Sequence, residues 1–148
     1  MSVTQTPARF WTYCVPTGSF YDPDGNLLGY MFYSGHGAGL NNPAMSAVPN
    51  VGPVPPGFYQ LGMPFTHPQL GRYVMRLIAL PGTDMQGRSS ICYHGDTSQD
   101  VATGQKLASE GCIVGALAGR EAVWNSGVHF VRVVDSTDEI PMQHAEAA

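Results

Sequence analysis

The chain has 148 residues, a length that supports one domain with a proper core and leaves little room for two. Its formal charge is −4 and only 12% of its residues are charged, so it lacks the basic patch that nucleic acid or an anionic membrane surface requires. No apolar run approaches the roughly 20 residues of a membrane span. We therefore exclude nucleic acid as a partner and predict no membrane span.

The beginning of the chain predicts a β-hairpin. Residues 10–15 and 19–21 are rich in aromatic and β-branched side chains, as strands are. Residues 22–26, Asp-Pro-Asp-Gly-Asn, are typical of a tight turn, after which the chain returns in a strand over residues 27–33. The 18 glycines and 12 prolines favour many such short strands joined by turns.

The middle of the chain combines a long loop with two further strands. Residues 34–57 show no periodicity, and a loop of this length in a compact domain is usually functional or disordered. His36 lies in this loop, where exposure to solvent is the simpler interpretation and contact with substrate the alternative. Strands are predicted over residues 57–62 and 72–80, and the second should be central because its apolar residues are nearly continuous.

The last third predicts helix and then strand. A short helix is expected over residues 101–107 and a stronger one over residues 116–125, with Gly127 as its C-terminal stop. Residues 128–134 predict a buried strand that closes the sheet. We expect its His129 to pack or hydrogen-bond, because no metal-ligand spacing surrounds it.

The two ends of the chain are predicted to lie outside the domain. The domain should cover residues 10–135, after an N-terminal segment over residues 1–9 and before a mobile polar tail over residues 136–148. Residues 1–7 have neither the basic n-region nor the apolar h-region of a Sec signal, so export by another route is expected if the substrate is outside the cytoplasm.

The three cysteines are an odd number, so they do not form a complete disulfide framework. Cys14 and Cys92 could form a disulfide after export, or Cys92 could be a buried thiol in a strand. Cys92 lies two residues before His94 and therefore on the same face of a strand, which makes it a rival nucleophile to Cys112.

The sequence contains a candidate nucleophile and base. An apolar run ends at His94, and 18 positions later Cys112 follows a Ser-x-Gly turn. An imidazole close to a thiol generates the thiolate that attacks a carbonyl. Gly111 allows close approach of the backbone, and the Gly111 and Cys112 amides could bind the oxyanion. We expect His94 and Cys112 to share one face of the sheet in a groove walled partly by residues 34–57.

Three neighbouring residues have secondary roles in this hypothesis. Ser109 shapes the turn or contacts substrate, and Gly95 ends the strand after His94. Asp96 could orient the imidazole, although an acid in a surface turn is the competing interpretation.

The pattern resembles a known family. His94-Gly95 followed by Ser109-x-Gly111-Cys112-Ile113 is similar to the signature of the YkuD-type L,D-transpeptidases, which remodel peptidoglycan, and residues 54–61 resemble a strand of that family. Residues 33–43 and 50–55 resemble the DUF2778 branch more closely, which is similar to the Tlde1 effectors of type VI secretion. The resemblance covers roughly residues 10–135.

The resemblance implies a fold and an activity. The fold would be mainly β with short helices (α+β), a single L,D-transpeptidase-like β-sandwich or barrel domain. Cys112 would attack a tetrapeptide stem of peptidoglycan and form a thioester. A stem amine, a D-amino acid or water would then accept the acyl group, with no cofactor and no metal. Secretion by a type VI system, action in the periplasm of a target bacterium and a cognate immunity protein are also implied.

Two departures and two alternatives accompany this assignment. The common family pattern has histidine two residues before the nucleophile and arginine or asparagine two after it, where this chain has Glu110 and Val114. A noncatalytic wall-binding or structural β domain with a buried cysteine is the main alternative. A cysteine peptidase or amidase of another fold is disfavoured because His94 precedes Cys112.

Overall fold

The computed structural model describes residues 6–30, 32–96 and 109–141 of the chain. The strands in this part of the chain are β1 (Trp11–Cys14), β2 (Ser19–Tyr21), β3 (Phe32–Ser34), β4 (Gly57–Leu61), β5 (Phe65–His67), β6 (Gly71–Ala79), β7 (Cys92–His94), β8 (Ile113–Gly115) and β9 (Phe130–Val134). The helices are the α-helix α2 (Leu117–Asn125) and three short 3-10 helices, η1 (Gly37–Gly39), η2 (Pro43–Met45) and η3 (Thr137–Glu139).

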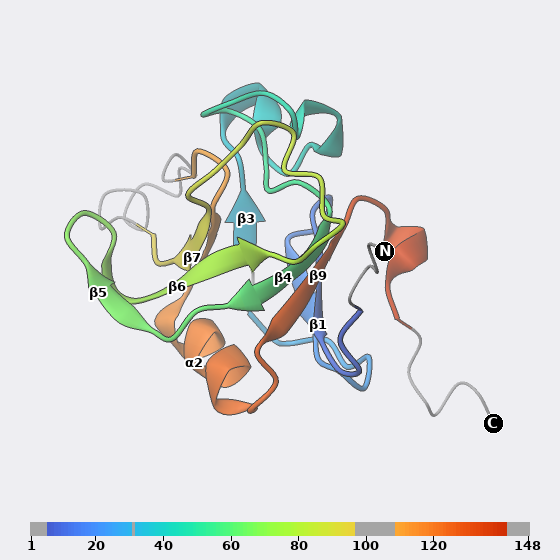
Figure 1. The fold of residues 1–148 in the computed structure, drawn as a ribbon, viewed down its shortest axis with the longest axis vertical. Helices are drawn as coiled ribbons and strands as arrows, with labels where there is room; N and C mark the ends of the chain where they lie inside the picture. Colours follow the sequence, from blue (N-terminus) through green and yellow to red (C-terminus); the bar gives the residue numbers. More distant parts are fainter. Residues whose placement is uncertain (1–5, 31, 97–108, 142–148) are drawn as a thin grey trace.

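These strands form a single curled sheet. Their order is β2-β1-β9-β4-β6-β7-β8-β3, with β5 paired to β6 (Figure 1). The sheet curls until its two end strands approach each other, and the Phe32 N–H donates a hydrogen bond of 2.9 Å to the Gly18 carbonyl beside β2. The fold is therefore mainly β and nearly closed into a barrel, as the sequence predicted.

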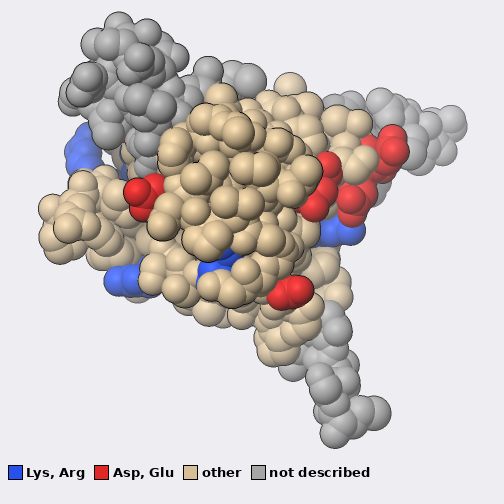
Figure 2. Space-filling model, turned by 90° about the horizontal axis from the view of Figure 1, so that it is seen from above, with Lys and Arg blue, Asp and Glu red and all other residues tan. Residues whose placement is uncertain are grey.

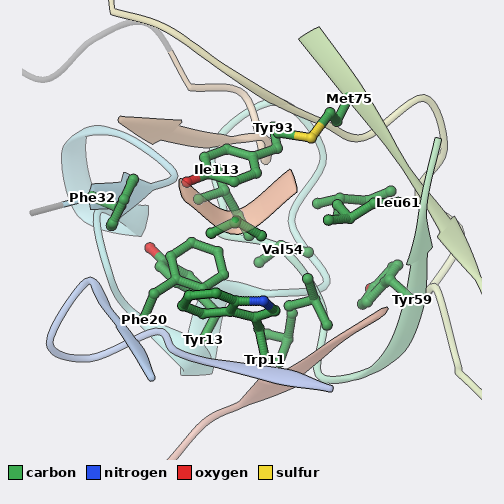
Figure 3. Packing of buried hydrophobic residues seen from close by; sticks show 14 of the residues in the cluster. Trp11, Tyr13, Phe20, Phe32, Val54, Tyr59, Leu61, Met75, Tyr93 and Ile113 are labelled. Carbon is green, nitrogen blue, oxygen red and sulfur yellow. The ribbon is translucent and has the colours of Figure 1, made fainter. Parts of the chain in front are cut away.

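Large aromatic side chains fill the interior of this barrel (Figure 3). The Phe20 ring of β2 stacks on Tyr93 of β7 with centroids 5.3 Å apart, and it meets the edge of Phe32 at 4.9 Å. Tyr13 and Phe20 are fully buried. The core thus connects the N-terminal hairpin to β7, the strand that ends at His94.

The N-terminal hairpin is present, but its third strand is shorter than predicted. Asp22 Oδ1 accepts hydrogen bonds of 2.9 Å from the Asp24 and Asn26 amides, which closes the turn. Of the predicted strand over residues 27–33, only Phe32 and Tyr33 pair, in β3, and Leu27 forms an isolated bridge to Tyr21. The Leu27 side chain is 59% exposed, whereas Leu28 packs against the core.

The other predicted elements can be compared with the structure one by one. β4, β6 and α2 lie where the sequence predicted them, whereas β5 was not predicted. The predicted helix over residues 101–107 lies outside the described residues. In the described part of the chain, no helix is long and apolar enough to cross a membrane.

The last strand starts later than predicted. His129 stacks on the Trp124 ring at 3.5 Å and donates from Nε2 to the Trp124 carbonyl, as expected of a packing residue. The turn before it holds Val128, whose amide donates to Ser126 Oγ, and β9 therefore begins at Phe130.

The expected mobile tail begins with ordered structure. Ser136 caps η3, and Glu139 in η3 pairs with Arg132 of β9 at 3.1 Å. Residues 142–148 of the predicted tail lie outside the described residues.

Candidate active site

The two segments that carry the predicted catalytic pair are neighbouring parallel strands. β7 ends at His94, and β8 begins one residue after Cys112. The register pairs His94 with Val114. Two residues earlier in each segment, Cys92 therefore lies opposite Cys112. Residues two apart share a face of a sheet, and diagonal neighbours of this kind have Cα atoms about 8 Å apart. The sheet therefore brings Cys112 and His94 within side-chain reach on one face.

Cys112 and His94 line the same groove, which has a volume of about 480 Å³. The loop over residues 34–57 contributes Asn50 to its wall, as predicted, and the β5–β6 hairpin contributes residues that the sequence did not single out. The other lining residues are His67, Gln69, Leu70, Ser89, Ser90, Ile91 and Glu110. Cys92 is not among the residues that line the groove and is only 4% exposed, so Cys112 is the cysteine that faces the groove.

The end of the molecule that carries η1 and η2 faces the viewer in Figure 2. Acidic and basic side chains are scattered on this face, and most of its visible surface is uncharged. This matches the small fraction of charged residues in the chain, 12%.

His94 is held in the form that a general base requires. Its Nδ1 lies 2.7 Å from the Gly95 carbonyl. A carbonyl oxygen only accepts hydrogen bonds, so Nδ1 carries the proton and Nε2 has the free lone pair of the neutral ring. Burial lowers the pKa of His94 below its ordinary value, and the Arg120 charge acts in the same direction, while Gly95 and Asp96 oppose them. The imidazole is therefore neutral at pH 7.

The Cys112 thiol lies against Cys92. The Cys92 N–H donates to Cys112 Sγ at 3.2 Å, and the two thiols are hydrogen-bonded to each other. The hydrogen bond from Cys112 lowers the pKa of Cys92 to about 7. The same contact, together with burial, raises the pKa of Cys112. Cys112 is consequently a protonated thiol at rest and needs a base to become a nucleophile.

The cysteines are all free in this structure. Cys14 is fully buried in β1, and the sulfur neighbour of Cys92 is Cys112. The disulfide between Cys14 and Cys92 that the sequence left open is therefore absent here, and Cys92 is a buried strand thiol.

Ser109 organises the turn before Cys112. Its hydroxyl is fully buried, accepts from the amides of Gly35 at 2.8 Å and Gly111 at 3.1 Å, and donates to the Cys112 carbonyl. Ser109 thus shapes the turn, which was one of its two predicted roles. The Gly111 amide is used by this contact, and of the two amides predicted to bind an oxyanion, that of Cys112 is the better candidate.

The long loop braces the same turn. Ser34 Oγ donates to the Gly111 carbonyl at 3.1 Å and accepts from the Val54 amide at 2.8 Å, and Ser34 is fully buried. His36 is half-buried, with Nδ1 2.8 Å from the Ser109 carbonyl. The exposed loop histidine expected at position 36 is therefore a brace of the turn, because β3 places the loop beside residues 109–111.

Gly95 and Asp96 come directly after His94 in the chain. Asp96 Oδ1 accepts a hydrogen bond of 2.9 Å from the Tyr33 hydroxyl, and its charge raises the pKa of His94. Gly95 leaves room for Arg120, since a Cβ there would lie 2.6 Å from Arg120 Nη2. His94 Nδ1–H donates to the Gly95 carbonyl, and this hydrogen bond orients the ring. The sequence suggested the Asp96 carboxylate as one candidate for that role.

Two buried arginines that the sequence analysis did not single out lie next to the catalytic segments. Arg88 donates to the Glu110 carbonyl at 2.7 Å, and Arg120 of α2 donates to the carbonyls of Gly115 and Tyr73 at 3.1 and 2.7 Å. The chain has only seven lysines and arginines, and this scarcity was the one sequence feature that could have drawn attention to them. A basic side chain is rarely buried unless it has hydrogen-bond or charge partners. Among the described residues, no group of three or more His, Cys, Asp or Glu side chains is arranged to hold a metal ion.

The comparisons with known proteins agree with the geometry. The family model of the Tlde1 domain matches residues 29–138, a range that contains both His94 and Cys112. No curated protein and no solved structure matches the chain.

Proposed function

Since the chain belongs to the Tlde1 domain family, we propose that it is a cysteine acyltransferase acting on the tetrapeptide stems of peptidoglycan. Family membership gives an effector-type domain of type VI secretion. The enzymatic activity, the substrate and the catalytic roles below are our proposal.

The observation that carries the proposal is the meeting of Cys112 and His94 in one groove. They come from adjacent parallel strands, share a face of the sheet and both line the same 480 Å³ space. A neutral, buried histidine with its Nε2 lone pair unprotonated, beside a groove-facing thiol, is the arrangement expected of a catalytic pair. The enzyme hypothesis is therefore better supported than the binding-module alternative.

In the first half-reaction His94 Nε2 takes the proton of the Cys112 thiol as Sγ attacks the carbonyl of the L-centre of diaminopimelate. The carbon becomes tetrahedral, and the Cys112 N–H is the proposed donor to its oxyanion. The intermediate then collapses. The C–N bond to the terminal D-alanine breaks, the amine leaves with the proton from His94, and the acyl group remains on Sγ as a thioester.

In the second half-reaction an acceptor attacks the thioester while His94 removes its proton. The amine of another stem gives a 3-3 cross-link, a free D-amino acid gives exchange, and water gives L,D-carboxypeptidase activity. Sγ leaves and takes the proton back from His94, which returns the thiol. One thioester thus serves three reactions.

We further propose that the protein acts in the periplasm of a target bacterium after type VI secretion, and that a cognate immunity protein covers the groove. Family membership supports both statements. If a small exported protein is encoded next to this chain and binds it, its coexpression should block access to Cys112.

The test is an assay on disaccharide tetrapeptides followed by mass spectrometry, with and without D-methionine. We expect loss of D-alanine, replacement by D-methionine or formation of dimers. Cys112→Ala should abolish every product, a loss of several orders of magnitude, because all three reactions need the same nucleophile.

Cys92→Ala is the matched control. It removes the neighbouring thiol and should retain activity, at a stability cost of about 1 kcal/mol for the small cavity. An active Cys112→Ala variant beside an inactive Cys92→Ala variant would reverse the two roles. Absence of all products with the wild-type protein would favour the binding-module alternative.

A further inference from the structure

Arg88 is a buried cation bonded only to backbone carbonyls among its described contacts. The residue is 8% exposed. Nη1 donates to the carbonyls of Ser46 at 2.7 Å and Pro53 at 3.0 Å, and Nη2 donates to those of Gly52 at 3.1 Å and Glu110 at 2.7 Å. Four well-formed hydrogen bonds fix the plane of the guanidinium group.

These four carbonyls come from two segments that are far apart in the sequence. Three belong to residues 46–53 of the long loop, and the fourth belongs to Glu110 in the turn before Cys112. The guanidinium therefore joins the loop to the turn. The bond to the Glu110 carbonyl fixes the peptide between Glu110 and Gly111, one residue from the sulfur-bearing Cα.

Gly111 gives a second, independent sign of this contact. A Cβ at this position would lie 2.1 Å from Arg88 Nη2, and the backbone has a φ of +127°, which side chains other than glycine rarely adopt. The glycine before the nucleophile thus has a specific purpose. It lets the guanidinium pack directly against the turn.

The charge of Arg88 is not neutralised by a described carboxylate. The ion pairs in the described part of the chain are Arg9 with Asp24 and Arg132 with Glu139. Burial lowers the pKa of Arg88, and the charge of a Cys112 thiolate opposes this by raising it. Attraction between two charges is mutual, so Arg88 favours the thiolate form of Cys112.

We propose that Arg88 is a positioning residue that fixes the peptide between Glu110 and Gly111 and holds a permanent positive charge next to the Cys112 nucleophile. The inference rests on the proposed role of Cys112. It assigns to Arg88 a positive charge beside Cys112, which no side chain within the Ser-x-Gly-Cys turn supplies. The turn itself contributes only the acidic Glu110, whose negative charge disfavours a thiolate.

The test measures the thiol directly and needs no substrate. The rate of Cys112 alkylation by iodoacetamide is followed from pH 5.5 to 10, with mass spectrometry of peptides to separate Cys112 from Cys14 and Cys92. In Arg88→Gln, which keeps hydrogen-bond donors and loses the charge, alkylation at pH 7 should fall about tenfold and its pH profile should move to higher pH. In Arg88→Lys, which keeps the charge and loses the planar fork of donors, the pH profile should stay close to its wild-type position and the rate at pH 7 should fall less than in Arg88→Gln.

Arg120→Gln is the matched control for stability. Arg120 is also buried, at 5% exposure, and donates to three backbone carbonyls, so its replacement should lower the melting temperature by a similar amount. Its charge acts on His94, whose pKa is lowered first by burial, so above pH 7 its loss should leave the position of the Cys112 profile unchanged. The control separates a loss of packing from a loss of charge beside the thiol.

The outcomes are decisive. A folded Arg88→Gln protein with a wild-type profile, or a shift of equal size in Arg120→Gln, would overturn the proposal. So would a folded Arg88→Lys protein whose pH profile moves to higher pH by about one unit or more, a comparison that remains available if Arg88→Gln does not fold. Since alkylation requires no turnover, an Arg88 effect without activity on tetrapeptides would contradict only the proposed function.

Discussion

The turn before Cys112 and the strand that ends at His94 are supported by different means. His94 is the last residue of β7, a strand that pairs with both β6 and β8, and its Nδ1–H donates to the adjacent Gly95 carbonyl, which orients the imidazole. Cys112 follows a turn outside the ladder, and this turn is held by Ser34 at the end of β3 and by Arg88. Regular sheet pairing positions the proposed base, whereas a network of buried hydrogen bonds positions the proposed nucleophile.

Both regions nevertheless share one device, a buried arginine packed against a glycine. Arg120 contacts Gly95 and Arg88 contacts Gly111. The two charges act in the same direction, because a nearby positive charge disfavours the protonated form of either group. Burial and then the Arg120 charge lower the pKa of His94, and the Arg88 charge favours the thiolate of Cys112. Two buried cations can thus hold a proposed base and a proposed nucleophile toward their deprotonated forms.

The largest expected effect comes from removing the base. His94→Gln should lower kcat by about 10²–10⁴-fold, since the proposed acceptor of the Cys112 proton would be lost. The assay on tetrapeptides measures the loss. His129→Gln, which alters a histidine packed on Trp124 outside the groove, should stay within about twofold of wild type. Equal losses in the two variants would contradict the assignment of His94.

Replacing Gly111 or Gly95 by alanine tests how closely each glycine packs against its arginine, Arg88 or Arg120. Gly111→Ala places a Cβ 2.1 Å from Arg88 Nη2 at a φ of +127°, so overpacking and backbone strain together should lower the free energy of unfolding by about 2–5 kcal/mol. Gly95→Ala meets only the end of the Arg120 side chain at 2.6 Å and has no positive φ, so it should lose about 1–2 kcal/mol. Urea unfolding gives both values, and a larger loss at Gly95 would reverse the comparison.

Loss of the Ser109 hydroxyl should weaken the nucleophile turn without touching the strand. Ser109→Ala leaves the buried amides of Gly35 and Gly111 without their acceptor, and the free energy of unfolding should fall by about 2–4 kcal/mol. Activity of the folded fraction should fall as well. Ser126→Ala removes a hydroxyl with several comparable bonds near Trp11, far from the groove, and should destabilise the protein while kcat is retained.

The smallest effect is expected in the pH dependence. Burial lowers the pKa of His94 below the ordinary value of 6.5, so kcat/KM should decline only at a pH below 6.5 as the base becomes protonated. The same shift links protonation to folding. The unfolded state takes up a proton near pH 6.5 and the native state does so only at lower pH, so stability present above pH 6.5 is lost as the pH falls through that interval. Urea unfolding at several pH values should show this loss in wild type and less of it in His94→Gln.

The sequence predicted the regular parts of this site well. Alternation and turn residues are local signals, and they predicted the N-terminal hairpin, β4, β6 and α2. They also placed His94 at the end of one strand and Cys112 before another. The parallel register that brings Cys112 and His94 onto one face could not be read from the spacing of the two segments.

The polar support of the nucleophile could not be predicted, because it is built from long-range contacts. Ser34 lies 77 residues from Gly111, and Arg88 lies 42 residues from Ser46. No local periodicity records that a serine or an arginine will be buried against distant carbonyls. His36 illustrates the same limit, since its flanking glycines favour an exposed loop while its ring in fact reaches the Ser109 carbonyl.

The place of β1 in the sheet has a consequence for how the domain can be shortened. The family match begins at residue 29, yet β1 lies between β2 and β9 near one end of the strand path and contributes Trp11 and Tyr13 to the core. A protein trimmed to residues 29–138 would expose the backbone edge of β9, with its apolar Val131 and Val133, to any other chain. Unprotected edges of this kind recruit further strands, so we expect the trimmed protein to aggregate, and the smallest soluble unit to include residues 10–28.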